Sequence, residues 1–384
     1  MSEGHLIRHD QPWLDLPEAL LVISCSARML VESAKKAQIN TFAIDHYADS
    51  DTRVAALKAV ALVNTLGAFD EVQLLDAADQ MRPGPRLPMI YGSGFDAQPD
   101  LLEKLSKGRE IIGNPPPLQR LFKEPRRFFD LLRQLEIPFP ETHLDPAQGG
   151  DDWLVKSGCS EGGKGVRFCA HKPLGPLEYL QRRLSGPTYS ALFLADGRKV
   201  RIIGFNTLWN QGGLERPFLF VGAIHATGLS ERQRQTMTGI IERLVQATGL
   251  LGLNSLDFML SPDDQVLVIE VNPRPSASMA LYDDDFPKGL VAAHIRACRG
   301  YLSPIGSPFK MRAFKVMIAP RKIVVRAGHD WPSWCQDRPV DDTVVHPDQP
   351  LCTIRAEGAS EAEVVALLDE RRALLEQTIA PVSA

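Results

Sequence analysis

Three side chains beyond the middle of the chain, Asp257, Glu270 and Asn272, have residue types and spacing that suit a cation site. Segments 255–260 and 266–272 have the composition of two strands joined by a short polar loop, which predicts a β-hairpin. Two carboxylates and one amide supply only oxygen ligands, the kind that Mg²⁺ or Mn²⁺ uses together with nucleotide phosphates. These three residues are therefore the candidate metal ligands.

The expected register of this hairpin brings the two carboxylates together. A four-residue loop that pairs Ser261 with Val266 places Asp257 directly opposite Glu270, about 5 Å away, where like charges repel unless a cation lies between them. Side chains alternate along a strand, so the other face is expected to be buried. That face would consist of Leu256, Phe258, Leu267, Ile269 and Val271. The alternative interpretation is an ordinary polar face of a surface hairpin.

Arg274 continues the second strand on the side of the carboxylates. A guanidinium can hold a phosphoryl group during its transfer, a task for which lysine is a poor substitute, so Arg274 is the candidate catalytic residue. Replacing Glu270 by Gln is expected to remove most activity. It is also expected to raise the melting temperature slightly, because it relaxes the repulsion with Asp257.

A second chemical feature is the glycine-rich segment 158–165, which lies between two strand-like segments. Gly158 to Lys164 satisfy the first seven positions of a phosphate-binding P-loop, but Gly165 stands where a Ser or Thr should bind magnesium, and a strand and a turn at 171–173 follow instead of a helix. A flexible hairpin loop that closes over triphosphate oxygens fits better, with Lys156 supplying positive charge. A tight hairpin with a solvated lysine is the alternative.

The elements that must position these residues are read from apolar periodicity and turn residues. Residues 1–112 have alternating strand and helix patterns, which predict an α/β region with a parallel sheet, and the chain as a whole is of the α/β (α+β) class. The predicted strands are 19–24, 41–45, 153–156, 166–169, 189–194 and 200–205, and the predicted helices are 28–37, 124–134, 231–248 and 361–376, with helical and strand patterns alternating through 54–66, 72–75 and 89–91.

Composition limits the classes of partner. The 384 residues carry 43 Lys and Arg against 47 Asp and Glu, and no basic block exists that would neutralise a nucleic-acid backbone. No apolar run is long enough to span a bilayer, and the first residues lack a secretory signal, so we expect a cytoplasmic protein. The 6 cysteines form no Cys-x-x-Cys pair. We expect them to be reduced thiols that are mostly buried.

Taken together, the motifs resemble those of the ATP-grasp superfamily. The resemblance rests on Lys156 with residues 157–166, on 181–187, on 256–258 and on 270–274. The Asn-Pro-Arg arrangement is similar to the biotin carboxylase branch, because the D-alanine–D-alanine ligase branch has an arginine where this chain has Ser255. Along the whole chain the sequence resembles predicted ATP-dependent carboligases, which are carboxylate-amine ligases. The residues that carry this wider resemblance are 24–28, Asp45, 91–95, 123–125 and 350–353.

The resemblance implies an ATP-grasp fold with an N-terminal α/β domain (1–112), a small central domain that carries the glycine-rich flap (113–190) and a C-terminal domain that carries the metal site (191–384). It makes Asp257, Glu270 and Asn272 the metal ligands and Arg274 the phosphoryl clamp. The implied ATP-binding residues are Lys123, Lys156, Glu161, Gly162, Gly163, Gly165, Gln181, Arg183 and Leu184. Thr188 stands near the position where the family often has a ribose-binding glutamate.

The implied activity uses ATP and Mg²⁺ to phosphorylate a carboxylate, and an amine then displaces phosphate from the acylphosphate to give an amide. A role in the biosynthesis of a one-carbon carrier cofactor is a further expectation. The alternatives are an ATP-grasp carboxylase with an acceptor such as bicarbonate and a non-catalytic nucleotide-binding module. Ser26 and Arg28, after the first strand, are the candidate substrate residues. We expect small carboxylate and amine substrates, no nucleic acid, no membrane, and a homodimer as the candidate assembly.

Overall fold

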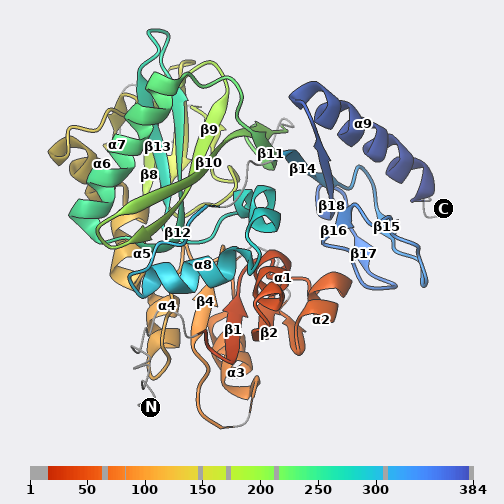
Figure 1. Cartoon of the computed structure of the whole chain (residues 1–384). Coiled ribbons are helices and arrows are strands. Elements are labelled where there is room, and N and C mark those ends of the chain that lie inside the picture. Colours follow the sequence, from red (N-terminus) through yellow and green to blue (C-terminus); the bar gives the residue numbers. More distant parts are fainter. Residues whose placement is uncertain are drawn as a thin grey trace, which may run out of the picture.

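The computed structural model describes residues 16–62, 68–82, 84–145, 150–169, 174–211, 216–305 and 310–379. Three main sheets and their helices make up this part of the chain (Figure 1). The N-terminal sheet lies at the bottom of Figure 1, and the large sheet extends from the upper left to the right, where its last strands lie beside the C-terminal helix.

The N-terminal sheet is parallel and has the strand order β3-β2-β1-β4. All 5 residues of β1 are buried, because this strand has neighbours on both edges and helices over its faces. The predicted α/β class with an N-terminal parallel sheet is therefore confirmed. Its elements are β1 (Ala19–Ile23), α1 (Arg28–Lys36), β2 (Asn40–Asp45), α2 (Ser50–Ala55), β3 (Lys58–Ala61), α3 (Glu71–Gln80), β4 (Met89–Tyr91) and α4 (Pro99–Ser106).

The structure settles which stretches of the alternating pattern are helical and which are strands. Residues 58–61 form edge strand β3, and residues 72–75 are part of helix α3. Asp70 begins α3 because its side chain accepts the backbone N–H of Gln73, and Leu74 and Ala78 are buried at helical spacing. Residues 63–67 lie outside the described part.

The small central sheet is antiparallel and has the order β5-β8-β6-β7. Strands β6 and β7 flank the glycine-rich loop, as the hairpin prediction required; the predicted turn at 171–173 lies outside the described residues. Helix α5 was not expected, and it begins at the prolines of 115–117, which are tolerated in a first helical turn. The elements are α5 (Pro116–Lys123), α6 (Pro125–Gln134), β5 (Thr142–His143), β6 (Trp153–Ser157), β7 (Arg167–Phe168) and β8 (Glu178–Arg182).

The large sheet is antiparallel, with the order β13-β12-β9-β10-β11-β14-β18-β16. Its strands are β9 (Thr188–Asp196), β10 (Val200–Asn210), β11 (Phe220–His225), β12 (Leu251–Leu260), β13 (Val266–Asn272), β14 (Met311–Ile318), β16 (Cys335–Gln336) and β18 (Pro350–Gly358). The accompanying elements are α7 (Glu231–Thr248), η2 (Ala277–Leu281), η3 (Asp283–Asp285), α8 (Gly289–Cys298), β15 (Ile323–Val324), β17 (Val344–Val345) and α9 (Glu361–Thr378).

Both faces of the large sheet are covered near β9. Phe193 of β9 packs into a core with α6 and α7, while Leu192 and Leu194 pack into a second core with α8 and α1. This two-sided burial explains why residues 189–195 are all buried and why their sequence is a continuous run of small and apolar residues. Helix α8 thus lies between the large sheet and the N-terminal part, as Figure 1 shows.

The β12–β13 hairpin has the expected carboxylate pairing and an unexpected register near its turn. Asp257 lies opposite Glu270, but Leu260, not Ser261, pairs with Val266, and Asp264 in the turn takes a φ of 61°. A β-bulge beside Asp257 leaves Ile269 as the extra residue and restores the pairing of the carboxylates. The prediction of the pair is confirmed, and the predicted pairing of Ser261 was wrong.

The bulge also changes which residues reach the core. Leu256, Phe258 and Val271 are buried in the core under α7, as predicted. Val266 and Val268 join them, because the bulge shifts the alternation of side chains by one residue. Ile269 is therefore only half-buried, and Leu267 is buried outside that core; their expected places in it were wrong.

The 6 cysteines are free thiols, but only Cys335 and Cys352 are buried and the others are half-buried, so the expectation that most are buried was wrong. Cys25 and Cys159 are less buried than Cys335 and Cys352, and both lie in loops beside the candidate site. In the described part of the chain, no helix combines the length and the apolar character that crossing a bilayer requires.

A buried histidine joins the N-terminal part to the large sheet. Nδ1 of His294 accepts the backbone N–H of Leu253 at 2.8 Å, so Nε2 carries the proton and donates to the carbonyl of Ile112 at 2.9 Å. Burial lowers the pKa of His294 to about 4, although the Ile112 carbonyl opposes this shift. The ring is therefore neutral in the folded protein at neutral pH.

We predict that His294 makes folding sensitive to acid. Because the unfolded chain binds a proton near pH 6.5 and the folded chain does so only near pH 4, the contribution is complete above pH 6.5 and is lost as pH falls towards 4, by about 3 kcal/mol. An NMR titration of the His294 ring measures its pKa, and urea unfolding at pH 7 and 4.5 measures the loss. Protonation of His294 above pH 6 would contradict this assignment.

Candidate functional site

The candidate metal ligands lie on β13, an edge strand of the large sheet, and on its neighbour β12. Asp257 faces Glu270 across the hairpin, and Asn272 lies two residues further along the strand. Burial raises the pKa of Asp257, and the facing Glu270 raises it further. Two carboxylates that face each other in this way suit a cation, and the donor set consists of oxygen atoms only. The three residues therefore fit a Mg²⁺ or Mn²⁺ ion.

Lys123 lies directly against this group, at the end of α5. Its Nζ contacts Oε1 of Glu270 at 2.5 Å and Oδ1 of Asn272 at 3.1 Å, and it also forms an ion pair with Asp96 at 2.6 Å. Burial alone would lower the pKa of Lys123, but the charges of Asp96 and Glu270 raise it. Lys123 is thus a fixed positive charge beside the predicted metal ligands.

Lys156 and Gln181 form a second polar pair on adjacent strands of the central sheet. Nζ of Lys156 donates to Oε1 of Gln181 at 2.7 Å, and Nε2 of Gln181 donates to Thr142 at 3.1 Å. Burial lowers the pKa of Lys156 to about 8, against the opposing charges of Glu270 and Asp257. The carboxylate pair therefore acts on Lys156 electrostatically, and a phosphate group would stabilise its charged form.

The glycine-rich loop packs closely on three other segments, and strand β7 follows it, which excludes the P-loop interpretation. A Cβ at Gly158 would lie 2.1 Å from the carbonyl oxygen of Lys123, and one at Gly163 would lie 1.9 Å from that of Phe218. Gly162 and Gly163 have φ of 62° and 74°. Gly163 therefore needs glycine both for its backbone conformation and for close contact, whereas Gly158 needs it for close contact and Gly162 for its backbone conformation. The carbonyl of Gly162 also accepts the N–H of Phe220 at 3.0 Å.

Gly165 has a local role, since a Cβ there would lie 2.3 Å from Oγ of Ser160 within the same loop. The remaining predicted nucleotide residues lie between the end of β8 and the start of β9, both ends included. Arg183 is exposed and its guanidinium lies 5.3 Å from the centre of the Phe168 ring, while Leu184 and Thr188 are half-buried. Among Gln181, Arg183, Leu184 and Thr188, Gln181 alone is buried, and it contacts Lys156.

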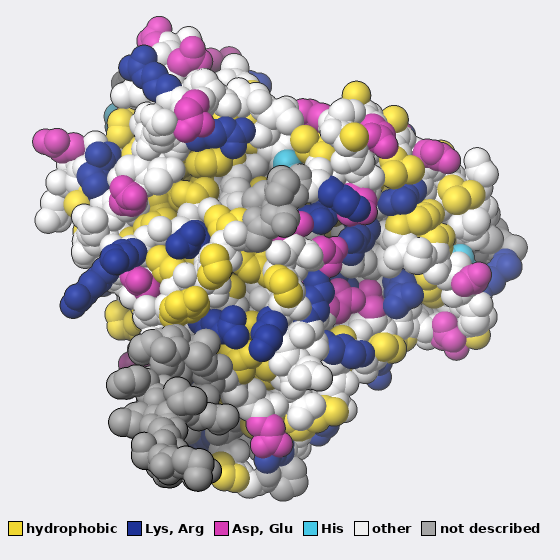
Figure 2. Space-filling view, viewed as in Figure 1, with side chains coloured by type: hydrophobic (Ala, Val, Ile, Leu, Met, Phe, Trp, Pro, Cys, Tyr) yellow, Lys and Arg dark blue, Asp and Glu magenta, His cyan; other side chains and the backbone are white. Residues whose placement is uncertain are grey.

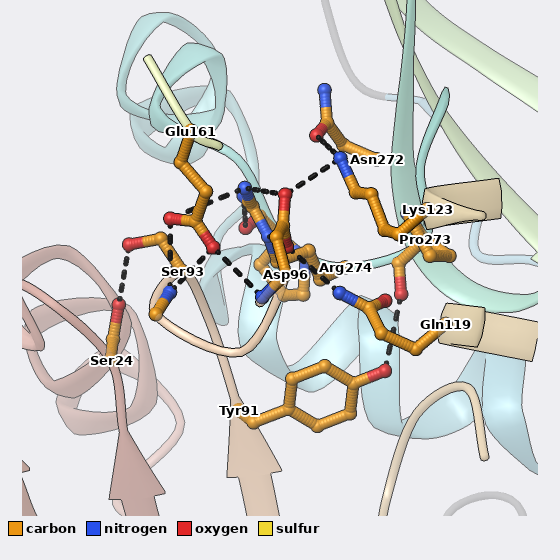
Figure 3. Close-up of polar contacts among 12 residues, drawn as sticks. Ser24, Tyr91, Ser93, Asp96, Gln119, Lys123, Glu161, Asn272, Pro273 and Arg274 are labelled. Carbon is orange, nitrogen blue, oxygen red and sulfur yellow. Dashed lines mark hydrogen bonds and ion pairs between the residues drawn. The ribbon is translucent and has the colours of Figure 1, made fainter. Parts of the chain in front are cut away.

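Arg274 lies in a buried ion cluster with Glu161, a predicted flap residue, and with Asp96, which sequence reasoning missed. Its Nε and Nη2 are 3.4 and 3.5 Å from the carboxylate of Asp96, and its Nη2 is 3.7 Å from Glu161 (Figure 3). Burial alone would lower the pKa of Arg274, but the charges of Asp96 and Glu161 raise it. The signal for Asp96 was its place just after β4, where open parallel sheets present ligand-binding residues.

Ser26 and Arg28 are not brought together with Arg274. Ser26 donates to Asp337 at 3.0 Å, and Nε of Arg28 donates to the same carboxylate at 2.8 Å, so both residues join the N-terminal part to the loop after β16. Arg28 is buried rather than a solvated helix residue. It also borders a separate pocket of about 460 Å³ between α1, α2 and the C-terminal strands. Their predicted substrate role stays a prediction.

The ion cluster of the site is largely enclosed. Figure 2 shows Lys, Arg, Asp and Glu side chains interspersed across this face without a large single-charge field. The residues of the ion cluster have little exposure, with 8% for the side chain of Arg274 and 5% for that of Lys123. Charges held this far from water act more strongly on a bound phosphate than surface charges do.

Comparisons with known proteins concern the domain and the fold that carry this site. Residues 124–278 match the family model described as an ATP-grasp domain. The fold resembles biotin carboxylase from Campylobacter jejuni (TM-score 0.68, 13% identity, 91% of this chain and 90% of that chain covered). It also resembles N5-carboxyaminoimidazole ribonucleotide synthetase from Thermotoga maritima (0.68, 14%, 94% and 98%) and L-amino acid ligase from Bacillus licheniformis (0.69, 15%, 93% and 97%). A comparison with curated proteins gives no match.

These likenesses confirm the ATP-grasp fold that the sequence motifs predicted. At such low identities they concern the fold, and the match to the ATP-grasp domain concerns residues 124–278. The matched segment contains Lys156, the glycine-rich loop and the predicted metal ligands, while Lys123 lies one residue before it.

We predict that Asp96 is essential for stability. Asp96→Asn removes a carboxylate that is 1% exposed and leaves Lys123 and Arg274 with less compensation, so unfolding should cost about 3 kcal/mol less. Asp100→Asn is the control, because its side chain is 81% exposed although it also pairs with an arginine, and it should change stability by less than about 0.5 kcal/mol. Urea unfolding at pH 7 compares them, and equal effects would refute the proposed importance of the buried cluster.

Proposed function

Because residues 124–278 form an ATP-grasp domain, we propose that this protein is an ATP-dependent ligase that joins a carboxylate to an amine and releases ADP and phosphate. The observation that carries the proposal is the contact of Lys123 with Glu270 and Asn272 of the hairpin, together with the carboxylate of Asp96 that Lys123 shares with Arg274. Such a set of fixed charges suits phosphoryl transfer, in which catalysis is mainly positioning and charge neutralisation.

In the proposed reaction a carboxylate oxygen attacks the γ-phosphorus of ATP. The new O–P bond gives an acylphosphate, and the bond to the β-phosphate breaks with its electron pair leaving on ADP. The nitrogen of an amine then attacks the acyl carbon and loses a proton, and phosphate leaves with the electron pair of the C–O bond. The product is an amide.

The chain's own residues would have distinct tasks in these steps. Lys123 and Lys156 would hold the nucleotide phosphates, with Gln181, Arg183 and Leu184 near the adenine and Glu161, Gly162, Gly163 and Gly165 in the flap over the triphosphate. Arg274 would neutralise the group in transfer. Asp257, Glu270 and Asn272 would hold a divalent cation, which when bound supplies charge neutralisation of phosphate oxygens. Enclosure of the site would protect the acylphosphate from water.

The experiment that tests the function measures ADP and phosphate release. A panel of amino acids, simple carboxylates, one-carbon carrier precursors and amines would be screened with ATP and Mg²⁺, with products identified by mass and hydroxylamine added to trap an acylphosphate as a hydroxamate. Bicarbonate belongs in the panel, because a carboxylase-type acceptor is the second candidate, and biotin carboxylase and N5-carboxyaminoimidazole ribonucleotide synthetase share the fold. Release of AMP and pyrophosphate would overturn the mechanism, and no turnover with any acceptor would favour a nucleotide-binding module.

We predict that Glu270→Gln folds normally and loses activity about 100-fold, because one charge of the predicted metal site is removed. High Mg²⁺ or Mn²⁺ should restore part of the loss. Asp263→Asn, in the exposed turn of the same hairpin, is the matched control and should keep wild-type activity. Full activity of Glu270→Gln at low Mg²⁺ would contradict the metal assignment.

The structure changes the expected effect of the same substitution on stability. The sequence predicted a higher melting temperature, because Asp257 and Glu270 repel. Glu270 also contacts Lys123 at 2.5 Å, so its charge is already compensated. We therefore expect Glu270→Gln to lower stability slightly, by less than about 1 kcal/mol for this half-exposed side chain, which thermal unfolding would measure.

A further inference from the structure

The carboxyl group of Glu161 occupies a site built from backbone N–H groups of another part of the chain. The N–H of Gly94 lies 2.7 Å from Oε1 and 2.9 Å from Oε2, and the N–H of Asp96 lies 3.3 Å from Oε1. Nη2 of Arg274 is 3.7 Å from Oε2. We call these two N–H groups and the guanidinium the Gly94 cradle; Figure 3 shows Glu161 reaching into it from the glycine-rich loop.

The cradle is a rigid feature of the N-terminal part. Gly94 has a φ of 109°, and a Cβ there would lie 2.6 Å from the ring of Phe69, so only glycine fits. Its loop is tied to the end of β1, because Ser93 accepts the N–H of Cys25 at 2.9 Å and its hydroxyl is 3.3 Å from that of Ser24. The N–H groups therefore point to one place whether or not Glu161 is there.

The position of the cradle in the fold favours a ligand site. The loop follows β4, next to β1, at the point where the strand order of the parallel sheet reverses. Ligands of open parallel sheets bind at the carboxyl ends of the strands at this point. The cradle also shares Arg274 with the proposed phosphoryl-transfer site, so a carboxylate bound there would lie beside the group in transfer.

The charged form of Glu161 is only weakly stabilised in the Gly94 cradle. Its side chain is only 18% exposed, and it lies against Asp96, a second carboxylate. Burial and Asp96 together raise the pKa of Glu161 to about 7, despite the N–H of Gly94 and the charge of Arg274. It is carried by a loop with 4 glycines between 158 and 165, which can reposition at lower cost than a helix or strand. A soluble carboxylate with no tie to this loop could displace it.

We propose that the Gly94 cradle binds the carboxylate of the substrate, and that Glu161 is an internal competitor for that site. The proposal rests on the proposed ligase function and names one of its substrate sites. The oxygen that faces Arg274 would be the one that attacks phosphorus, the other would accept the N–H of Asp96, and the N–H of Gly94 would lie between the two oxygens, as it does with Glu161. The flap residue predicted to bind ATP would thus govern carboxylate affinity instead.

The test uses acetate as a carboxylate probe on the intact protein, without any need for turnover. Thermal unfolding of wild type, Glu161→Ala and Glu161→Gln would be followed in rising sodium acetate against sodium chloride of the same ionic strength. The matched control is Glu178→Gln, because Glu178 also accepts a backbone N–H, from Gly175, and an arginine contact, from Arg167, outside the cradle.

We expect both Glu161 variants to bind acetate about tenfold more tightly than wild type. In wild type, acetate must first displace the Glu161 carboxyl group, and the loss of one such hydrogen-bonded group corresponds to about a tenfold change in affinity. Glu178→Gln should match wild type, and Arg274→Met added to Glu161→Ala should remove the gain. Acetate binding that is unchanged in both Glu161 variants would overturn the proposal.

Kinetics with the substrates found in the functional screen separate this proposal from the proposed function. The KM for the carboxylate should fall in Glu161→Ala while the KM for ATP changes less than about twofold. A raised KM for ATP without a gain in carboxylate binding would identify Glu161 as a nucleotide residue and overturn the competitor assignment. The acetate result stands or falls independently of whether the screen finds turnover.

Discussion

The arrangement of the site depends on one buried ion cluster, in which Asp96 contacts both Lys123 and Arg274. The three residues come from the loop after β4, the end of α5 and the segment after β13, so the cluster joins the N-terminal part to both other sheets. A carboxylate that is 1% exposed is tolerable only because two cations compensate it, and two buried cations would repel each other without it. This mutual dependence fixes the guanidinium of Arg274 beside the carboxylate hairpin.

Neutral hydrogen bonds reinforce the same junction. The amide of Asn114 donates to Asn254 at 2.7 Å and to the carbonyl of Pro273 at 2.9 Å, and its oxygen accepts the N–H of Leu251 at 2.8 Å. Tyr91 donates to the carbonyl of Asn114 at 2.8 Å. The residue immediately before Arg274 is therefore held by the N-terminal part. Positioning of this kind reduces the reorganisation that phosphoryl transfer would otherwise require.

The cations of the site differ in how firmly the protein holds their charge. Lys123 and Arg274 are paired with carboxylates that raise their pKa, whereas burial lowers the pKa of Lys156 to about 8 and its hydrogen-bond partner is the neutral Gln181. Lys156 thus has the most to gain from a phosphate group. The carboxylate pair on β12 and β13 would in turn be stabilised by a cation. The proposed site is therefore stabilised by both components of a metal–nucleotide complex, the phosphate at Lys156 and the metal at the carboxylates.

The sequence by itself determined the parallel N-terminal region, the hairpin nature of the glycine-rich loop and the opposition of Asp257 and Glu270, because alternation and turn residues are local signals. It did not determine the register near the turn of that hairpin, since a single bulge at Ile269 moves Val266 and Val268 into the core. Nor did it reveal Asp96 or the cradle at Gly94. These depend on contacts of Asp96 with Glu161 and Arg274, which lie 65 and 178 residues away in the chain, and only the packing of the tertiary structure decides which buried charges meet.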